Sequence, residues 1–202
     1  MKTYEVRYSE GLDPSSGTPL TDFAFPWLKK RAPRTEFRAV WNEQALSFSF
    51  EVTDRDLVLA EAEDPGEAAL GSDRVEIFVA SSADLTEPYY GAEMDPRGNL
   101  YDYRATYHRQ FEPEWTFSNF RFRGEIHEKG YRVRGRFSME ELRSLDCLKE
   151  KEMIAGLYRA EFSHKKGDTN EIEENWISWV DPGTKEEDFH VPSSFGKFLL
   201  VW

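Results

Sequence analysis

Two carboxylates lie inside stretches of sequence that are otherwise apolar. Glu76 stands within residues 75–79, and Glu93 alternates with apolar neighbours in the same way. A charged group in such surroundings needs a partner, because burying it alone is costly. The partner is either an arginine, for which Arg104 and Arg159 are candidates, or the polar groups of a bound ligand. Both interpretations remain open at the level of sequence.

Aromatic rings concentrate near the C-terminus, where we expect function to lie. Phe189 falls on a polar loop, either as a flat platform for a ligand or as a packing plug, with Asp181 as a polar neighbour. Trp179 is in strand phase with Ile177, so it is either a platform or a core residue. Trp115 lies in a loop with proline and acidic neighbours and is a further candidate platform. Aromatics exposed on loops are costly unless they bind something.

Alternation of apolar and polar residues with a period of two dominates the chain. Residues 46–52 alternate cleanly, which indicates a half-buried antiparallel strand. The sequence from Ser138 to Glu141 matches a capping box and predicts one short helix at 138–145. We therefore predict an all-β protein, an antiparallel β-sandwich of jelly-roll or immunoglobulin-like type, formed by residues 1–202 as a single domain. Its strands are expected at 36–41, 46–52, 75–79, 89–94, 100–107, 120–126, 131–137 and 153–162, with a last one after Gly196.

The composition limits the possible partners. The chain has 202 residues and a net charge of −12, which argues against nucleic acid and anionic membranes. Cys147 is the only cysteine, so no internal disulfide can form. The N-terminus lacks the apolar core of a signal peptide, and no stretch approaches a transmembrane span. The expectation is a cytoplasmic monomer, or a secreted protein if a leader has been removed.

Acidic residues gather in the long loop 53–72. Asp54 and Asp56 are candidate ligands for calcium, which prefers hard oxygen donors. The spacing matches no EF-hand, so a solvated acidic loop is the alternative. The histidines are scattered and lack the spacing of a zinc site.

A run of arginines alternates along two predicted strands. We expect them to cover a solvated sheet face, paired across strands with acids. The set comprises Arg121, Arg123, Arg132, Arg134 and Arg136.

Four segments in chain order, the last of them in two parts, resemble motifs of carbohydrate-binding module family 9. Residues 37–54 look like its W-D-x-x-L-Y-V-x-x-x-V-x-D hairpin, and residues 73–79, D-R-V-E-I-F-V, are similar to its D-S-V-E-I-F-I strand. Residues 89–100 resemble the Y-Y-x-F-E-x-N-P-x-G-x-L stretch of the family-9-like branch. Residues 177–182 and 189–196 resemble its terminal I-S-W-x-D-P and W-x-x-P-x-x-F-G signatures. The resemblance runs from about residue 35 to the end.

The resemblance implies a β-sandwich that binds the ends of xylan- or cellulose-type saccharides between two aromatic rings. Glu76 falls on an acidic position of the motifs, and Phe189 falls on the second ring position. Glu93 matches a glutamate of the family-9-like branch and stands where characterised binding modules carry an arginine. Leu70 stands where the first ring is expected, so the two-ring clamp is incomplete. Structural calcium is implied for some members. The predicted function is non-catalytic binding of an oligosaccharide or polysaccharide, without enzymatic activity.

Three alternatives remain at this level. The first is a structural or interaction domain whose sugar site has decayed, for which Leu70 is the best support. The second is a glycoside hydrolase that uses Glu76 and Glu93 as its carboxylates. The third is a haem-binding relative with Met94 and His190 as axial ligands.

Overall fold

The computed structural model describes residues 1–165 and 167–202, with no side-chain description for 168–170. No helix in this part of the chain is long and apolar enough to cross a membrane. The elements are β1 (Thr3–Tyr8), η1 (Pro14–Ser16), β2 (Thr35–Trp41), β3 (Ala45–Thr53), α1 (Pro65–Leu70), β4 (Arg74–Ala80), β5 (Tyr89–Met94), β6 (Leu100–Thr106), β7 (Gln110–Glu112), β8 (Arg121–His127), β9 (Gly130–Ser138), α2 (Met139–Ser144), β10 (Glu152–Lys165), β11 (Asp168–Ser178), η2 (Pro192–Ser194) and β12 (Gly196–Val201).

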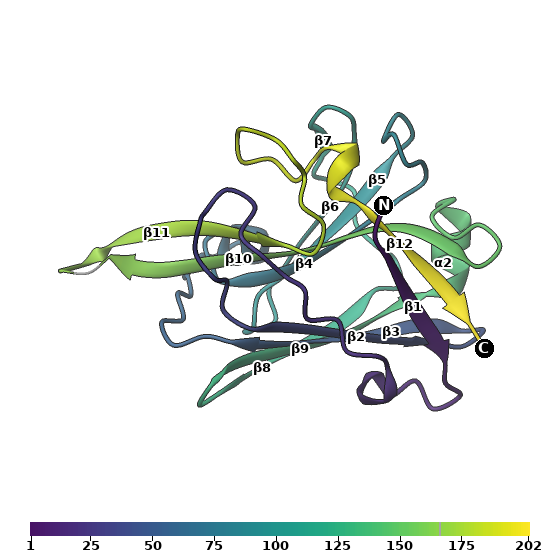
Figure 1. The fold of residues 1–202 in the computed structure, drawn as a ribbon, viewed down its shortest axis with the longest axis horizontal. Coiled ribbons are helices and arrows are strands. Elements are labelled where there is room, and N and C mark those ends of the chain that lie inside the picture. Colours follow the sequence, from purple (N-terminus) through teal and green to yellow (C-terminus); the bar gives the residue numbers. More distant parts are fainter. Residues whose placement is uncertain (166) are drawn as a thin grey trace.

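The strands belong to one sheet that curls back on itself, so its two halves face each other as layers (Figure 1). The strand order is β7-β6-β5-β4-β10-β12-β1-β2-β3-β9-β8, and β11 pairs with β10 outside this path. Most pairs are antiparallel, but β1 runs parallel to both of its neighbours, β12 and β2. In Figure 1, β1 and β12 join the layer of β4 and β10 to the layer of β2, β3, β8 and β9.

The all-β class predicted from alternation is confirmed, and so is the helix α2. The Ser138 hydroxyl accepts a hydrogen bond from the Glu141 backbone N–H at its N-terminus. Two features go beyond the prediction. The sheet is mixed and not purely antiparallel, and the acidic loop contains a second short helix, α1, whose first turn is capped by Asp64. A helix of six residues is too short to show a period in the sequence.

Apolar side chains from both layers form the core between them. The predicted inward face of β3 is confirmed, because Phe48 and Phe50 are fully buried. Phe50 meets Phe37 of β2 with ring centroids 4.9 Å apart. Trp179, a candidate platform in the sequence, also belongs to this core and is 2% exposed. Its ring lies against the backbone of Gly196, where an added Cβ would stand 2.5 Å from the indole. Because the ring is enclosed, Trp179 is corrected to a structural residue.

A buried ion pair joins the two layers. The Arg159 Nη2 of β10 lies 2.6 Å from the Asp54 Oδ2 at the end of β3, and Arg159 is fully buried. The Arg159 Nη1 also donates to the Thr53 carbonyl and the Thr35 hydroxyl, each at 3.4 Å. Arg159 is therefore a structural cation of the core and not a ligand-binding group. Burial, and then the charge of Asp54, raise the pKa of neighbouring Asp73 to about 8.

Replacing Arg159 by alanine is expected to lower the free energy of unfolding by about 3–5 kcal/mol, because Asp54 would remain buried without its partner. Urea denaturation measures this loss. The matched control is Arg132→Ala, which removes a half-exposed arginine paired with Glu51. Its cost should be about 1 kcal/mol or less. Equal losses for the two variants would contradict the structural role of Arg159.

Candidate functional site: an aromatic cleft on a charged floor

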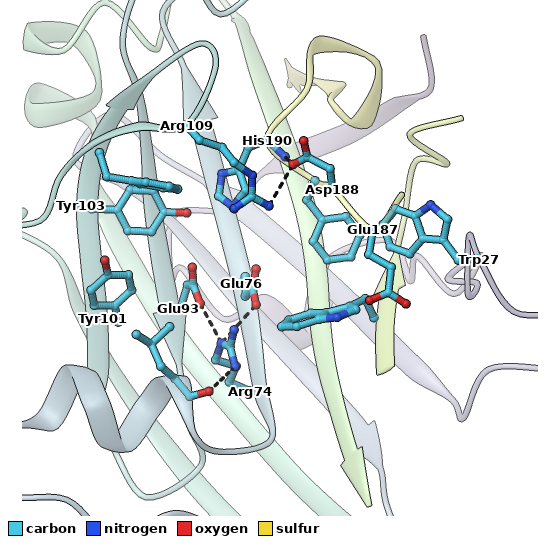
Figure 2. Close-up of a pocket in the computed structure, with 14 residues that line it drawn as sticks. Trp27, Arg74, Glu76, Glu93, Tyr101, Tyr103, Arg109, Glu187, Asp188 and His190 are labelled. Atoms are coloured by element: carbon cyan, nitrogen blue, oxygen red, sulfur yellow. Dashed lines mark hydrogen bonds and ion pairs between the residues drawn. The ribbon is translucent and has the colours of Figure 1, made fainter. Parts of the chain in front are cut away.

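A cleft of about 330 Å³ opens on the outer face of the layer formed by β4, β5, β6 and β10. The tail loop that follows β11 forms one side of the cleft, and the β6–β7 region forms another (Figure 2). The lining residues are Trp27, Leu70, Arg74, Glu76, Glu93, Tyr101, Tyr103, Arg109, Phe111, Trp176, Glu187, Asp188, Phe189 and His190.

Strand β4, which carries part of the floor of the cleft, is buried on both of its faces. Alternation sends Val75 and Ile77 into the core between the layers, which turns Arg74 and Glu76 to the outer face. An outer face would normally be solvated, but here the tail loop covers part of it. Phe189 of that loop packs on Tyr158 of β10 with ring centroids 4.4 Å apart and planes inclined by 20°.

Two opposing carboxylates and one arginine form the floor. Glu76 and Glu93 stand directly opposite each other in the register of β4 and β5. The Arg74 Nε lies 2.7 Å from the Glu93 Oε2 and 3.2 Å from the Glu76 Oε1 (Figure 2). The Arg74 Nη1 donates to the Leu70 carbonyl at 2.9 Å, which ties the end of α1 to the floor. All three charged side chains are almost completely enclosed.

This enclosure changes the protonation of the floor. Burial, and then the charge of Glu93, raise the pKa of Glu76 to about 8, although Arg74 opposes the shift. The pair therefore holds a proton at neutral pH. Apart from the 3.2 Å ion-pair contact of the Glu76 Oε1 with Arg74, the buried Glu76 Oε1 and Tyr103 hydroxyl have no well-directed hydrogen bond to the described residues. Buried polar atoms without partners are rare in folded proteins, so these two are suited to bond a ligand.

Aromatic side chains form the walls. Trp176 of β11 is partly exposed, and the Arg74 Cζ lies 5.3 Å from its ring centroid. The contact is possible because the small Ala160 stands between them, paired with both across the strands. Leu70 is 39% exposed at the edge of the cleft, whereas Phe189 is only 6% exposed.

The rim is held by a polar cluster that anchors the tail loop. The Asp188 carboxylate lies 2.7 Å from the His108 Nε2 and 3.1 Å from the Arg109 Nη2, both in the turn between β6 and β7. The Tyr89 hydroxyl lies 2.9 Å from the His190 Nδ1. Burial, and then the charge of Arg109, lower the pKa of His190 to about 3. His190 is therefore neutral at physiological pH.

The structure brings together only some of the residues singled out in the sequence. Glu76, Glu93 and Phe189 all line this cleft, and Leu70 lies at its edge. The rings of Trp27, Tyr101, Tyr103 and Trp176, and the guanidinium of Arg74, were not foreseen there. Trp176 was not among the site candidates singled out in the sequence. Its phase opposite to Ile177 was the available signal, because it predicts an outward ring.

The remaining candidates lie elsewhere. Trp115 packs on Tyr90 with ring centroids 4.7 Å apart, beside the core. Arg104 is half-exposed on β6 and lies 3.6 Å from Glu112. Asp181 is exposed, and its carboxylate accepts from the Gly183 N–H within its own turn. None of these three lines the cleft, because each is held by local contacts on a different part of the surface.

The two predicted calcium ligands do not fit a calcium site. Asp54 is committed to Arg159, and the Asp56 carboxylate accepts from the backbone N–H of His164 at 2.7 Å and contacts its ring at the same distance. Calcium takes about six to eight oxygen ligands. Nowhere in the described residues do three or more His, Cys, Asp or Glu side chains gather as a possible metal site.

A curled β-sheet with an aromatic cleft on its outer face places the protein with the β-sandwich carbohydrate-binding modules. The chain belongs to the family described as carbohydrate family 9 binding domain-like, whose family model matches residues 16–202. The family expected from the four sequence segments is thereby confirmed. No curated protein sequence matches the chain.

Solved structures share the fold. A protein from Bacteroides uniformis proposed to bind carbohydrate has a TM-score of 0.71 at 14% identity, over 98% of this chain and 99% of that one. A family 9 carbohydrate-binding module from Caldicellulosiruptor kristjanssonii in complex with glucose has a TM-score of 0.57 at 20% identity, over 98% and 95%. The complex of such a module from that organism with cellotriose has a TM-score of 0.59 at 19% identity, over 99% and 94%.

The raised pKa of Glu76 predicts how stability depends on pH. An unfolded chain releases this proton near pH 4.5 and the folded chain near pH 8, so the folded state holds an extra proton between these values. Stability then falls as the pH rises through this window. Glu76→Gln removes one such proton, so its free energy of unfolding should fall less steeply from about pH 5 to about pH 8. Asp73, whose pKa is also about 8, adds to this fall, whereas His190, whose pKa is about 3, opposes it below about pH 6.5; both contributions remain in the variant.

Chemical denaturation at several pH values measures both slopes. Glu87→Gln, which changes an exposed acid away from the cleft, is the matched control and should keep the wild-type slope. A slope in Glu76→Gln as steep as that of the wild type would contradict the buried proton.

Proposed function

We propose that the cleft binds terminal sugar residues of an oligosaccharide or polysaccharide of the cellulose or xylan type, without catalysis. The observation that carries this proposal is the enclosed floor of Arg74, Glu76 and Glu93 beneath aromatic walls. Glu76 falls on an acidic position of the family motifs, and Glu93 matches a glutamate of the family-9-like branch. The complexes of the Caldicellulosiruptor kristjanssonii modules with glucose and cellotriose support the choice of a glucose-based ligand.

The chemistry of the cleft suits a sugar. A sugar offers C–H faces, which stack on rings such as Trp176, and hydroxyl edges, which need paired donors and acceptors. In the described structure the Tyr103 hydroxyl makes no hydrogen bond, and the Glu76 Oε1 has only its 3.2 Å ion-pair contact with Arg74, so both atoms can accept a further bond. Ligand pockets range from about 300 to 1,000 Å³. A cleft of about 330 Å³ is at the small end of this range and favours a chain end over a long stretch of polymer.

The floor geometry favours binding over glycoside hydrolysis. A hydrolase places its two carboxylates on either side of the scissile bond, about 5–9.5 Å apart. Here Glu76 and Glu93 both contact the same nitrogen of Arg74, so a guanidinium occupies the space between them. Turnover of aryl glycosides by the purified protein would contradict this reading.

The haem alternative does not fit the structure. Met94 is fully buried in the core between the layers, whereas His190 lies on the outer face of the sheet beside the cleft. The two side chains lie on opposite faces of one sheet and cannot hold the same iron. The alternative of a decayed sugar site is addressed directly by binding measurements.

Calorimetry with cello- and xylo-oligosaccharides tests the proposal, and Trp176→Ala is the most informative variant. Removing this wall should weaken cellotriose binding about 5–10-fold, since an aromatic contact contributes roughly 1 kcal/mol. Trp202→Ala is the matched control, because Trp202 is 72% exposed and lies outside the cleft. It should bind like the wild type. No binding of any oligosaccharide at millimolar concentration would favour the decayed-site alternative.

Leu70→Trp should strengthen binding, because it places a ring where the family motif predicts one. Leu70 is 39% exposed at the end of α1, so the larger side chain has room toward the cleft. We expect an affinity about 3–10-fold higher for cellotriose, the gain from one added stacking contact. Leu70→Ala serves as the comparison and should gain nothing. An unchanged affinity in Leu70→Trp would show that the ligand does not reach this side of the cleft.

A further inference from the structure

The outer face of the opposite layer carries a groove of its own. It has a volume of about 540 Å³ and lies between strands β8 and β9 and the segment 11–14 that precedes η1. This face belongs to the layer of β2, β3, β8 and β9, whereas the sugar cleft lies on β4, β5, β6 and β10. The groove is lined by Gly11, Leu12, Asp13, Pro14, Ser47, Arg121, Phe122, Arg123, Arg134, Gly135 and Arg136.

Four of the lining arginines face one another across the two strands. Arg121 is directly opposite Arg136, and Arg123 is directly opposite Arg134. Acids had been expected at these cross-strand positions. Only the fifth arginine of the run meets that expectation, because Arg132 pairs with Glu51 and Glu125 in the next row of the sheet.

These four guanidinium groups outnumber the acids near them, although the charge of Arg134, after the hydrogen bonds from Ser15, helps to lower the pKa of the Asp13 carboxyl. In the described part of the chain, none of them lies within ion-pair distance of a carboxylate. The Arg134 Nε is buried and has no hydrogen-bond partner there. Asp13 supplies the only acidic side chain of the groove lining, and its carboxylate accepts hydrogen bonds from the backbone N–H and hydroxyl of Ser15 at 3.0 and 2.8 Å. The groove therefore holds four cations against one anion.

Composition does not force this arrangement. The chain has 38 acidic and 26 basic residues, so acids are available in excess. Like charges directly opposite each other on neighbouring strands destabilise a sheet. Two such pairs side by side, in a protein with a net charge of −12, are accounted for if an anion neutralises them.

We propose that this groove is a second binding site, separate from the cleft, for the carboxylate or sulfate groups of an acidic oligosaccharide. Guanidinium groups bind both oxyanions with paired hydrogen bonds. Neighbouring strands lie about 5 Å apart and alternate residues about 7 Å apart, so the four groups form a compact patch that accommodates closely spaced anions. The four arginines alone support the inference of an anion site. The inference that the anionic groups belong to a sugar rests on the proposed function.

The surroundings favour a short ligand over an extended polyanion. In the next row of the sheet the charges are balanced, because Glu36 pairs with Arg34 and Arg38, and Glu51 and Glu125 pair with Arg132. The whole molecule is strongly negative. A long nucleic acid would extend beyond the four arginines, where no further excess of cations holds it, and the net charge of −12 would repel it.

The test uses calorimetry at low salt with trigalacturonate, a sulfated heparin tetrasaccharide and neutral cellotriose. The variant is the double substitution Arg123→Gln with Arg134→Gln. Its matched control is Arg55→Gln with Arg143→Gln, which removes the same charge from exposed positions outside the groove. We expect at least one acidic probe to bind the wild type, a loss of tenfold or more in the groove variant, and a change under twofold in the control.

Three outcomes of the binding measurements would overturn the proposal. The first is that neither acidic probe binds, and the second is that the control loses as much affinity as the groove variant. The third is tighter binding of a hexaglutamate peptide or a short oligodeoxythymidylate at the same salt. Thermal unfolding adds an independent readout, because the groove variant should melt at or above the wild-type Tm once the like charges are removed. A clearly lower Tm would show that these arginines stabilise the sheet and would contradict the proposal.

Cellotriose separates the two sites. Its binding should be the same in the wild type, the groove variant and the control, since the cleft lies on the other layer. Failure of cellotriose to bind, with acidic probes behaving as expected, would refute the function proposed for the cleft and leave the groove as an anion site.

Discussion

Much of the site depends on one arginine placed between two carboxylates. Glu76 and Glu93 stand opposite each other on adjacent strands and are almost completely enclosed. Two such charges would repel each other and remain poorly solvated, so the arrangement is stable only with a cation beside them. Arg74 supplies that cation, and the pair retains a proton. The same guanidinium holds the end of α1 through the Leu70 carbonyl and faces the ring of Trp176.

This arrangement explains why an outer sheet face can be a binding surface. The core between the layers is filled by apolar packing and by the Arg159–Asp54 pair. On the outer face, the tail loop covers the sheet only in part, and Asp188 anchors it to the β6–β7 turn. The part of the outer face that the loop leaves uncovered is the cleft, with its charged floor and several aromatic rings. A partly covered outer face of this kind provides the enclosed surface that the binding proposed for the cleft requires.

Local pattern was enough to predict much of the fold. Alternation in residues 46–52 predicted the inward face of β3, and the capping box at Ser138 predicted α2. The apolar surroundings of Glu76 and Glu93 correctly indicated buried acids that need a partner. The identity of that partner could not be read, because Arg74 meets Glu93 only through the pairing of β4 with β5. Register between strands is a property of the folded sheet.

The same reason explains the other corrections. Trp176 and Trp179 are three residues apart and lie on opposite faces, but only the pairing of β11 with β10 shows which face carries the cleft. Arg159 was predicted to lie inside a strand as a candidate partner of the buried glutamates, whereas in the fold it links the two layers through its ion pair with Asp54. The arginine run was expected to meet acids, whereas the register of β8 and β9 sets four of its members against one another.

The central claim is that the cleft of Arg74, Glu76 and Glu93 binds sugar, and the indole N–H signals of the six tryptophans test it most directly. Of these six, only Trp27 and Trp176 line the cleft. The experiment is a titration with cellotriose followed by two-dimensional nitrogen–proton NMR. We predict that the signals of these two shift in a saturable manner at millimolar sugar or below, while the signals of Trp41, Trp115, Trp179 and Trp202 stay in place. No saturable shift, or shifts confined to tryptophans outside the cleft, would contradict the account.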